Sequence, residues 1–254
     1  TSSSGSLGGR DSALLTDASP PNSTSSGDDE ASSVLSLEEE KRLQVEWSKA
    51  YHEIDAYPDV AAKDKELSGA DEVKLDVDTY FSNFIQDDAP YSLPNYMVNV
   101  VGDTDVKATK WTDEDNEADN SNGGGDGSCG TVTVKTRTIE YVHPVNAPMA
   151  PPTAKARKEQ KLRKYGNHGL IIETETYVKD VPMTDCFYIK DILRIERKDD
   201  ESSSSLLLNF RFEVVFVKST YFQSMITRTS RSEIKKEVAI LVDWLNKKAL
   251  SLDR

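Results

Sequence analysis

One short glycine-rich segment has the spacing of a nucleotide-binding motif. Residues 125–130 (GDGSCG) match G-x-G-x-x-G, in which glycines and the start of a helix hold the pyrophosphate of a dinucleotide. Here the segment follows the acidic stretch DEDNEADNSN and opens a strand-like run. It therefore lacks the helix N-terminus, and nearby carboxylates would repel phosphate. We interpret residues 112–130 as a flexible acidic and Gly-rich insertion.

The residues that commonly bind metals or attack substrates are scattered along the chain. His52, His143 and His168 have no Cys or His neighbours at ligand spacing, so we expect no metal site. Cys129 and Cys186 are too few for a disulfide scaffold, and we expect reduced thiols. No nucleophile elbow, paired-His motif, phosphate loop or acid and base pair is found. We therefore expect neither an enzyme nor a cofactor.

A stiff loop without Asp, Glu, Lys or Arg is the most distinctive stretch of the sequence. Residues 143–153 read HPVNAPMAPPT and contain four prolines. Because proline restricts the backbone, such a loop loses little conformational freedom when it enters another phase. We expect a lid that dips into a lipid bilayer, with Met149 as its deepest point. The lid residues are Val145, Asn146, Ala147, Pro148, Met149, Ala150, Pro151, Pro152 and Thr153.

A row of basic residues follows this loop. Lys155, Arg157, Lys161 and Arg163 share one parity of an alternating run, so a strand would place them on one face. Each could attract anionic headgroups by about 1 kcal/mol near a membrane surface. An ordinary solvated strand face is the competing interpretation. We expect no nucleic-acid partner, because no exposed aromatics interleave with the row and the chain is acidic.

The charge and composition divide the chain into three parts. Residues 1–33 are rich in Ser, Gly and Asp and predict a disordered leader. Residues 34–71 predict an amphipathic helix and an acidic linker, and residues 72–250 a folded domain. Residues 1–76 hold 17 acidic and 7 basic side chains, and so most of the formal net charge of −13.

The sequence contains no recognisable membrane span or signal peptide. No apolar run reaches the roughly 20 residues that cross a bilayer, and the N-terminus lacks the regions of a signal peptide. Because the chain begins with Thr1, we expect it to be a piece of a longer protein.

The helices are predicted from capping residues and spacing. Ser36 and Glu39 form a capping box, and an apolar stripe that includes Trp47 follows until Pro58. We expect this helix to pack on the domain or on an upstream neighbour; a partner-binding helix is the alternative. Short helices are expected after Asp76 or Asp78 and near Pro94.

Alternating apolar and polar residues predict one antiparallel sheet with a single buried face. A change to helical spacing then predicts a C-terminal helix that runs from Phe222 to Leu250, with a break at TRTSRSE where Ser232 caps a new segment. A curved sheet around one long helix is an α+β helix-grip fold. The expected strands are 131–142, 153–165, 169–178, 186–197 and 205–217.

Motifs in the same order point to a known family. Residues 72 to about 250 resemble the VASt domain, the START-like sterol-binding module of the Aster and Lam/Ltc proteins of membrane contact sites. The matching features are Trp111, the spacing of Arg137 and Tyr141, APMAPPTA at 147–154, Gln160, DVPMTDCF at 180–187 and VVFVKSTYFQSMI at 214–226. Met183 and Cys186 stand where the family usually has aromatic residues.

The resemblance implies a lipid carrier with its ligand between the sheet and the C-terminal helix. It implies sterol transfer at contact sites, an anionic membrane surface as partner, and a parent with a GRAM domain and an anchor in the endoplasmic reticulum. A lipid-sensing or regulatory module without transfer is the alternative. The candidate cavity wall comprises Ile172, Thr174, Thr176, Phe187, Ile189, Phe210, Phe212, Met225 and Ile226.

Two questions about this wall stay open in the sequence. The same residues would also suit a solid core. Asp191 has the inward parity of its strand, where it could bind a lipid hydroxyl, but we expect a bulge to turn it outward.

Overall fold

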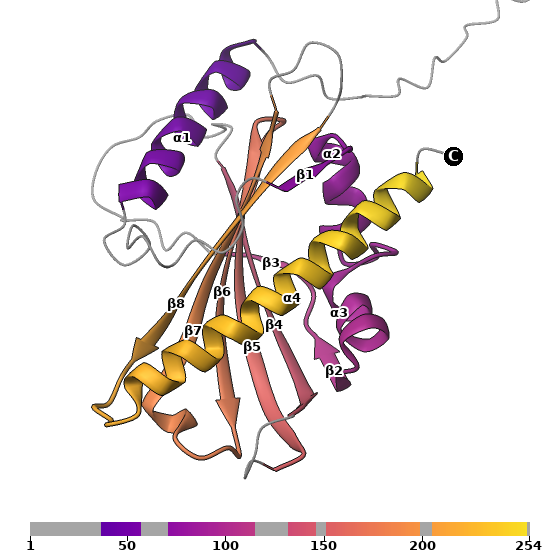
Figure 1. The fold of residues 1–254 in the computed structure, drawn as a ribbon. Helices are drawn as coiled ribbons and strands as arrows, with labels where there is room; N and C mark the ends of the chain where they lie inside the picture. Colours follow the sequence, from indigo (N-terminus) through magenta and orange to yellow (C-terminus); the bar gives the residue numbers. More distant parts are fainter. Residues whose placement is uncertain (1–36, 57–70, 115–131, 146–150, 199–204, 253–254) are drawn as a thin grey trace, which may run out of the picture. The chain divides into compact units, whose positions relative to one another are not determined.

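The fold is taken from a computed structural model that describes residues 37–56, 71–114, 132–145, 151–198 and 205–252 (Figure 1). The predicted leader and most of the acidic insertion lie outside these residues. Their boundaries therefore stay predictions.

The described residues form two long helices, several short helical turns and eight strands. In chain order they are α1 (Leu37–Ala56), β1 (Asp71–Val73), α2 (Val77–Tyr80), the π-helix η1 (Phe81–Ile85), α3 (Leu93–Tyr96), the π-helix η2 (Met97–Val101), β2 (Thr104–Ala108), β3 (Thr112–Asp113), β4 (Thr133–Pro144), β5 (Thr153–Tyr165), β6 (Gly169–Lys179), the 3-10 helix η3 (Thr184–Cys186), β7 (Phe187–Arg197), β8 (Leu206–Phe216) and α4 (Gln223–Leu252).

The strands of the described residues form an antiparallel sheet in the order β1-β8-β7-β6-β5-β4-β2, and β3 pairs with β4. The five predicted strands are confirmed, with ends within two residues of the expected ones. Together with the C-terminal helix, the curved sheet is the expected α+β helix-grip fold (Figure 1).

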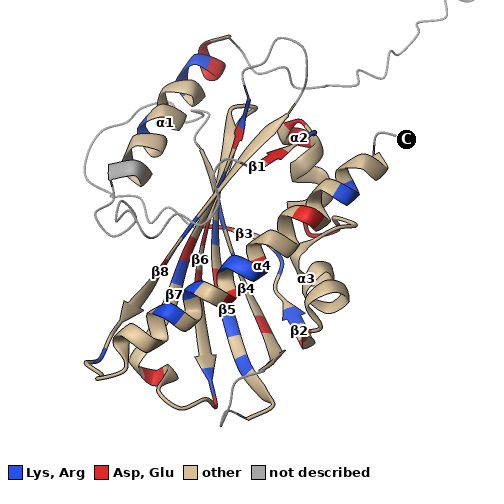
Figure 2. Ribbon diagram, in the orientation of Figure 1, with Lys and Arg blue, Asp and Glu red and all other residues tan. Residues whose placement is uncertain are grey.

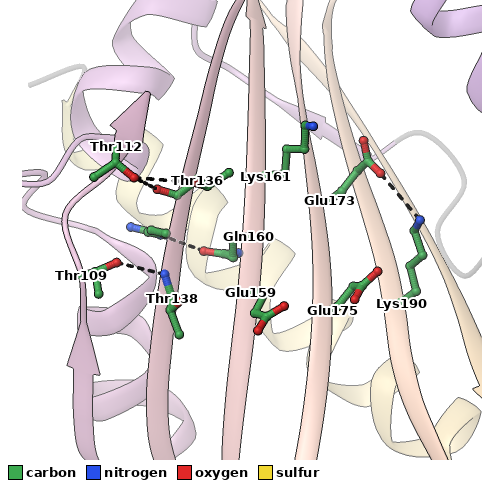
Figure 3. A pocket seen from close by; sticks show the side chains of 11 residues that line it. Thr109, Thr112, Thr136, Thr138, Glu159, Gln160, Lys161, Glu173, Glu175 and Lys190 are labelled. Atoms are coloured by element: carbon green, nitrogen blue, oxygen red, sulfur yellow. Dashed lines mark hydrogen bonds and ion pairs between the residues drawn. The ribbon is translucent and has the colours of Figure 1, made fainter. Parts of the chain in front are cut away.

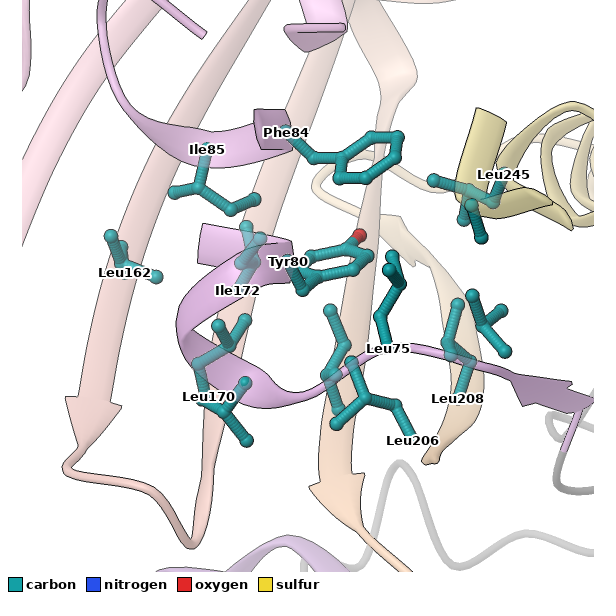
Figure 4. Packing of buried hydrophobic residues seen from close by; sticks show 14 residues of the cluster. Leu75, Tyr80, Phe84, Ile85, Leu162, Leu170, Ile172, Leu206, Leu208 and Leu245 are labelled. Atoms are coloured by element: carbon teal, nitrogen blue, oxygen red, sulfur yellow. The ribbon is translucent and has the colours of Figure 1, made fainter. Parts of the chain in front are cut away.

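The inner face of the sheet is the one that faces α4. Every second residue of each strand lies on this face, and near β1 these residues form a close-packed core with α2, η1 and the second half of α4. Tyr80 and Phe84 stack there, with ring centroids 5.0 Å apart, and Leu245 of α4 lies nearby (Figure 4). Asp76 accepts a hydrogen bond from the Thr79 amide and thereby caps α2, as expected.

Helix α4 differs from the prediction in two ways. It continues without a break through Ser232, so the predicted recapping is wrong. Met225 is 59% exposed, so the expected apolar stripe does not extend to the first turns. An unbroken helix keeps its period of 3.6 residues, and steps of three and four back from Leu245 lead to Arg231 and Thr227. Apart from the half-buried Ile226 and Ile234, the first half of α4 therefore presents polar side chains on the face that is apolar in its second half.

Helix α1 packs on the outer face of the sheet, as one of the alternatives expected. Ala50 and Ile54 lie in a buried cluster with Tyr165, Ile171 and other outward-facing residues of the sheet. The ring centroid of Trp47 is 5.4 Å from that of Tyr165. The helix is thus bound to the sheet through its apolar stripe.

A second contact of α1 uses Tyr51. The Arg194 guanidinium lies 3.8 Å from the centroid of the Tyr51 ring and donates a hydrogen bond of 3.2 Å to its hydroxyl. Because Arg194 is buried and has little access to water, the Tyr51 ring and hydroxyl provide part of the stabilisation that its charge would otherwise receive from solvent.

We expect Gly169→Ala to destabilise this packing. A Cβ at Gly169 would lie 2.4 Å from the Ile195 carbonyl oxygen and 2.7 Å from the Trp47 ring. The backbone oxygen cannot move easily, so the free energy of unfolding should fall by about 1–3 kcal/mol, the usual cost of overpacking. Urea unfolding measures this. The Trp47→Ala background should relieve only the ring contact, and an unchanged midpoint for Gly169→Ala would contradict the close approach.

Candidate functional site

The inner face of the sheet changes character along the strands. Near β1 its apolar residues are buried, but toward the opposite end they are only half-buried, although α4 crosses above them. The half-buried residues that do not belong to the packed clusters are Phe187, Ile189, Phe210, Val214 and Phe216. Because the first half of α4 offers them polar partners, this part of the inner face is an apolar wall that the protein does not fill.

A hollow of about 450 Å³ lies where this wall meets the start of α4. Its lining combines one aromatic ring of β8 with polar side chains of the helix: Phe216, Gln223, Ser224, Thr227, Arg228 and Arg231.

The residues proposed for the cavity wall fall into three groups. Ile172, Thr174, Thr176 and Phe212 are buried; Phe187, Ile189, Phe210 and Ile226 are half-buried; and Met225 is exposed. Ile172 belongs to the packed core, which is the alternative that the sequence left open. Met225 is not among the residues that line the hollow beside Phe216, so its place on the wall stays a prediction. A lipid-binding role of the others stays a prediction.

A polar network that the sequence did not predict crosses the middle of the inner face. The Lys158 ammonium donates a hydrogen bond of 3.2 Å to the hydroxyl of Thr176. Gln160 donates one of 3.2 Å to the hydroxyl of Thr174 and accepts one of 2.8 Å from Arg137. These residues have the same parity as the apolar ones, and that parity was the signal that could have identified Lys158.

Asp191 belongs to this network. It pairs with Thr174 of β6 and Phe212 of β8 in an unbroken register, so the predicted outward bulge is wrong and the carboxyl group faces inward. Burial raises the pKa of Asp191 to about 6, although the Lys158 ammonium and the Thr174 hydroxyl oppose the shift. Burial also disfavours the charged form of Lys158, but Tyr141, Asp191 and Glu237 outweigh this and raise its pKa.

A further polar contact lies where β4 enters the Pro-rich loop. His143 Nδ1 is 2.7 Å from a carboxylate oxygen of the buried Asp103. This hydrogen bond raises the pKa of His143, and burial only partly offsets it. Polar groups thus extend from the base of the loop to the middle of the inner face.

The Pro-rich segment forms the tip of the β4–β5 hairpin. Pro144 pairs with Thr153, and the Val145 amide donates a hydrogen bond of 2.8 Å to the Pro152 carbonyl. Residues 146–150, which include Met149, lie outside the described residues. Since β4 runs toward this tip and β8 ends beside the start of β7, the tip lies at the same end of the sheet as the half-buried wall.

The basic row of β5 lies on the outer face and is not a row of unpaired cations. Lys155, Arg157 and Lys161 lie 3.4, 2.6 and 2.6 Å from Asp180, Glu159 and Glu114, and Arg163 pairs with Glu173. Because a strand rises about 3.3 Å per residue, Arg163 lies about 26 Å from Lys155 and cannot share one membrane surface at the tip. These geometric findings weaken the expected membrane-facing role.

The outer face is polar throughout this region (Figure 3). A hollow of about 380 Å³ lies over β4, β5 and β6, and Lys190 is 3.8 Å from Glu173 at its edge. Its lining residues are Thr109, Thr112, Thr136, Arg137, Thr138, Glu159, Gln160, Lys161, Glu173, Glu175 and Lys190. Such a surface cannot shield a lipid tail, so the inner face is the candidate site.

The described residues contain no membrane-spanning helix and no cluster of metal ligands. No helix there combines the length and the apolar composition that a bilayer crossing requires. No three His, Cys, Asp or Glu side chains of the described residues converge as they do around a metal ion.

Comparison with known proteins supports the resemblance drawn from the motifs. The family described as "VAD1 Analog of StAR-related lipid transfer domain" (VASt) matches residues 69–233, more than half of the chain. The chain is also similar to the Arabidopsis thaliana "Protein VASCULAR ASSOCIATED DEATH 1, chloroplastic", with 23% identity over 165 residues. These residues are 65% of this chain and 25% of that protein, so the chain spans about a quarter of its relative's length.

The raised pKa of Asp191 predicts a pH-dependent stability. Between the ordinary value of 3.8 and about 6, the folded protein holds a proton that the unfolded chain releases. The free energy of unfolding should therefore fall as pH rises through this range. Asp191→Asn mimics the protonated form, so its stability relative to wild type should increase by about 1–3 kcal/mol from pH 4 to pH 7.

Urea unfolding at both pH values gives the comparison. Lys158→Met should move the transition to higher pH, because the ammonium lowers the pKa of Asp191. A difference between Asp191→Asn and wild type that does not change with pH would contradict the burial of this carboxyl group.

Proposed function

Because the chain belongs to the VASt family, we propose that it binds one lipid, most simply a sterol, between the inner face of its sheet and α4 and transfers it between membranes. The observation that carries this proposal is the wall of half-buried apolar residues, among them Ile189 and Phe210, under the polar first half of α4. In a protein interior such side chains are normally covered. A bound lipid would cover them here.

The energetic benefit of such a site is large. A sterol exposes about 20 apolar carbons to water, and each costs about 0.8 kcal/mol, so on the order of 16 kcal/mol opposes its passage between membranes. A protein that surrounds most of these carbons removes most of that barrier. The polar outer face offers no comparable surface.

The polar network gives the ligand an orientation in this proposal. Lys158 and Asp191 lie on the same inner face as the apolar wall, and they offer a donor and an acceptor in the middle of the sheet. A lipid hydroxyl that reached them would replace hydrogen bonds that it loses on leaving the membrane surface. The hydrocarbon part would then lie along the wall toward Phe187 and Phe216.

The setting of the domain is also part of the proposal. The Pro-rich loop would act as the lid at the open end, since its hairpin and the half-buried wall share that end of the sheet. The family resemblance supports a longer parent with a GRAM domain and an anchor in the endoplasmic reticulum, which would hold the domain at contact sites. The relative's name mentions neither a lipid nor a contact site, so this setting rests on the resemblance.

A cavity-filling substitution tests the site. We expect Ile189→Trp to lower the rate of sterol transfer at least tenfold, because the indole would occupy the space that the ligand needs. The measurement is transfer of a fluorescent sterol between donor and acceptor vesicles by residues 1–254. Val215→Trp, on the outer parity of β8, is the matched control and should retain transfer. Equal transfer by both variants would contradict an inner-face site, and stoichiometric binding without transfer would favour a sensor.

The lid has its own test. We expect Met149→Asp to abolish extraction of lipid from vesicles while the unfolding midpoint stays nearly unchanged, because a carboxylate at the tip opposes insertion into the bilayer. Binding of lipid that is already dispersed in detergent should persist. Undiminished extraction by the variant would remove the lid from the mechanism.

A further inference from the structure

The corner between β8 and α4 exposes a cluster of large apolar side chains. Val217, Tyr221, Phe222 and Met225 have exposed fractions of 61%, 105%, 47% and 59%. These four residues lie within nine positions of the chain, whereas single exposed apolar residues are common on soluble proteins. Such a cluster marks a surface for another protein or for a membrane.

The corner is held in place by its backbone. The amides of Val217 and Lys218 both donate hydrogen bonds to the Cys186 carbonyl, of 2.8 and 3.2 Å. The Ile226 amide donates to the Phe222 carbonyl and so begins the hydrogen bonding of α4. The apolar side chains are therefore presented on a fixed framework, which reduces the entropy lost when they are buried.

The charge of the corner favours one class of partner. Residues 217–231 (VKSTYFQSMITRTSR) contain three basic residues and no acidic one, in a chain whose formal net charge is −13. Lys218 pairs with Asp185 of η3 at 2.7 Å, so the basic character of the corner comes from Arg228 and Arg231. Lys and Arg mark the corner and the first half of α4 in Figure 2. Arg228 forms no ion pair with any described residue, unlike the basic row of β5. A locally basic surface with apolar side chains is typical of membrane-binding segments.

The hollow beside the apolar cluster has the chemistry of a phosphate site. Arg228 and Arg231 line it together with the hydroxyl groups of Ser224 and Thr227. Guanidinium and hydroxyl groups donate hydrogen bonds to phosphate oxygens, and arginine does so with two parallel bonds. A phospholipid headgroup could occupy this hollow while its tails remain in the bilayer beside Phe222 and Met225.

We infer that this corner docks the domain on a bilayer of anionic phospholipids, with the four apolar side chains inserted and the two arginines on lipid phosphates. The corner and the Pro-rich hairpin lie at the same end of the sheet, because β4 and β8 both run toward it. The inference deepens the proposed function, since docking here would bring the open end of the apolar wall to the membrane. It replaces the β5 row as the cationic contact.

The test is co-sedimentation of residues 1–254 with vesicles of phosphatidylcholine, with or without phosphatidylserine. The double substitution Phe222→Ser and Met225→Ser should weaken binding to both kinds of vesicle by about tenfold or more. The control is Ile240→Ser, which removes another exposed apolar residue of α4. Equal weakening by the control, or none by the double substitution, would overturn the inference.

A second pair of variants tests the arginines. Arg228→Gln should weaken binding about fivefold when phosphatidylserine is present, and less on phosphatidylcholine alone, because the choline group offsets the charge of that lipid's phosphate. Lys235→Gln, an exposed position of the same helix, should have little effect. An equal effect of both substitutions would indicate a diffuse charge effect and overturn the site. Because the assay records vesicle binding and no lipid transfer, its outcome does not depend on whether a lipid is carried.

Discussion

The structure depends on the limited length of apolar surface on α4. A sheet with one inner face needs a cover along its whole length, since exposed apolar side chains cost free energy in proportion to their area. Helix α4 provides that cover where Val238, Leu245 and Ala249 are buried. Its earlier turns carry polar side chains such as Thr227 and Arg231, which cannot cover apolar surface. The core therefore ends partway along the strands, and the proposed ligand site begins where the core ends.

The fold was readable because its signals are local. Alternation of apolar and polar residues defines β4 to β8, and it needs no knowledge of the partner strands. The face of α4 that contacts the sheet was harder to predict. Phe222 and Met225 extend the apolar stripe of this helix only if the helix breaks near Ser232. The helix does not break, and its period then carries these residues to the solvent side.

The site was less readable because its chemistry is non-local. Lys158 and Asp191 are ordinary charged residues in the sequence, and only the pairing of β5, β6 and β7 brings them together on the inner face. The ion pairs of the basic row were hidden in the sequence for the same reason. Glu114 and Glu173, which pair with two of its members, lie on other strands or beside them. The position of a charged residue in the alternation of a strand can predict that its side chain faces inward. The pairing register of the neighbouring strands is needed to identify the residues that surround it.

The helix α1 has a practical consequence for anyone who expresses this domain. Residues 37–56 and the last turns of α4 both lie outside the region 69–233 that defines the family. A fragment cut at those limits would lose the cover of Tyr165 and Ile171 on one face and Leu245 on the other. Such a fragment would expose two apolar patches and tend to aggregate, so the folding unit of this chain extends beyond the residues that match the family.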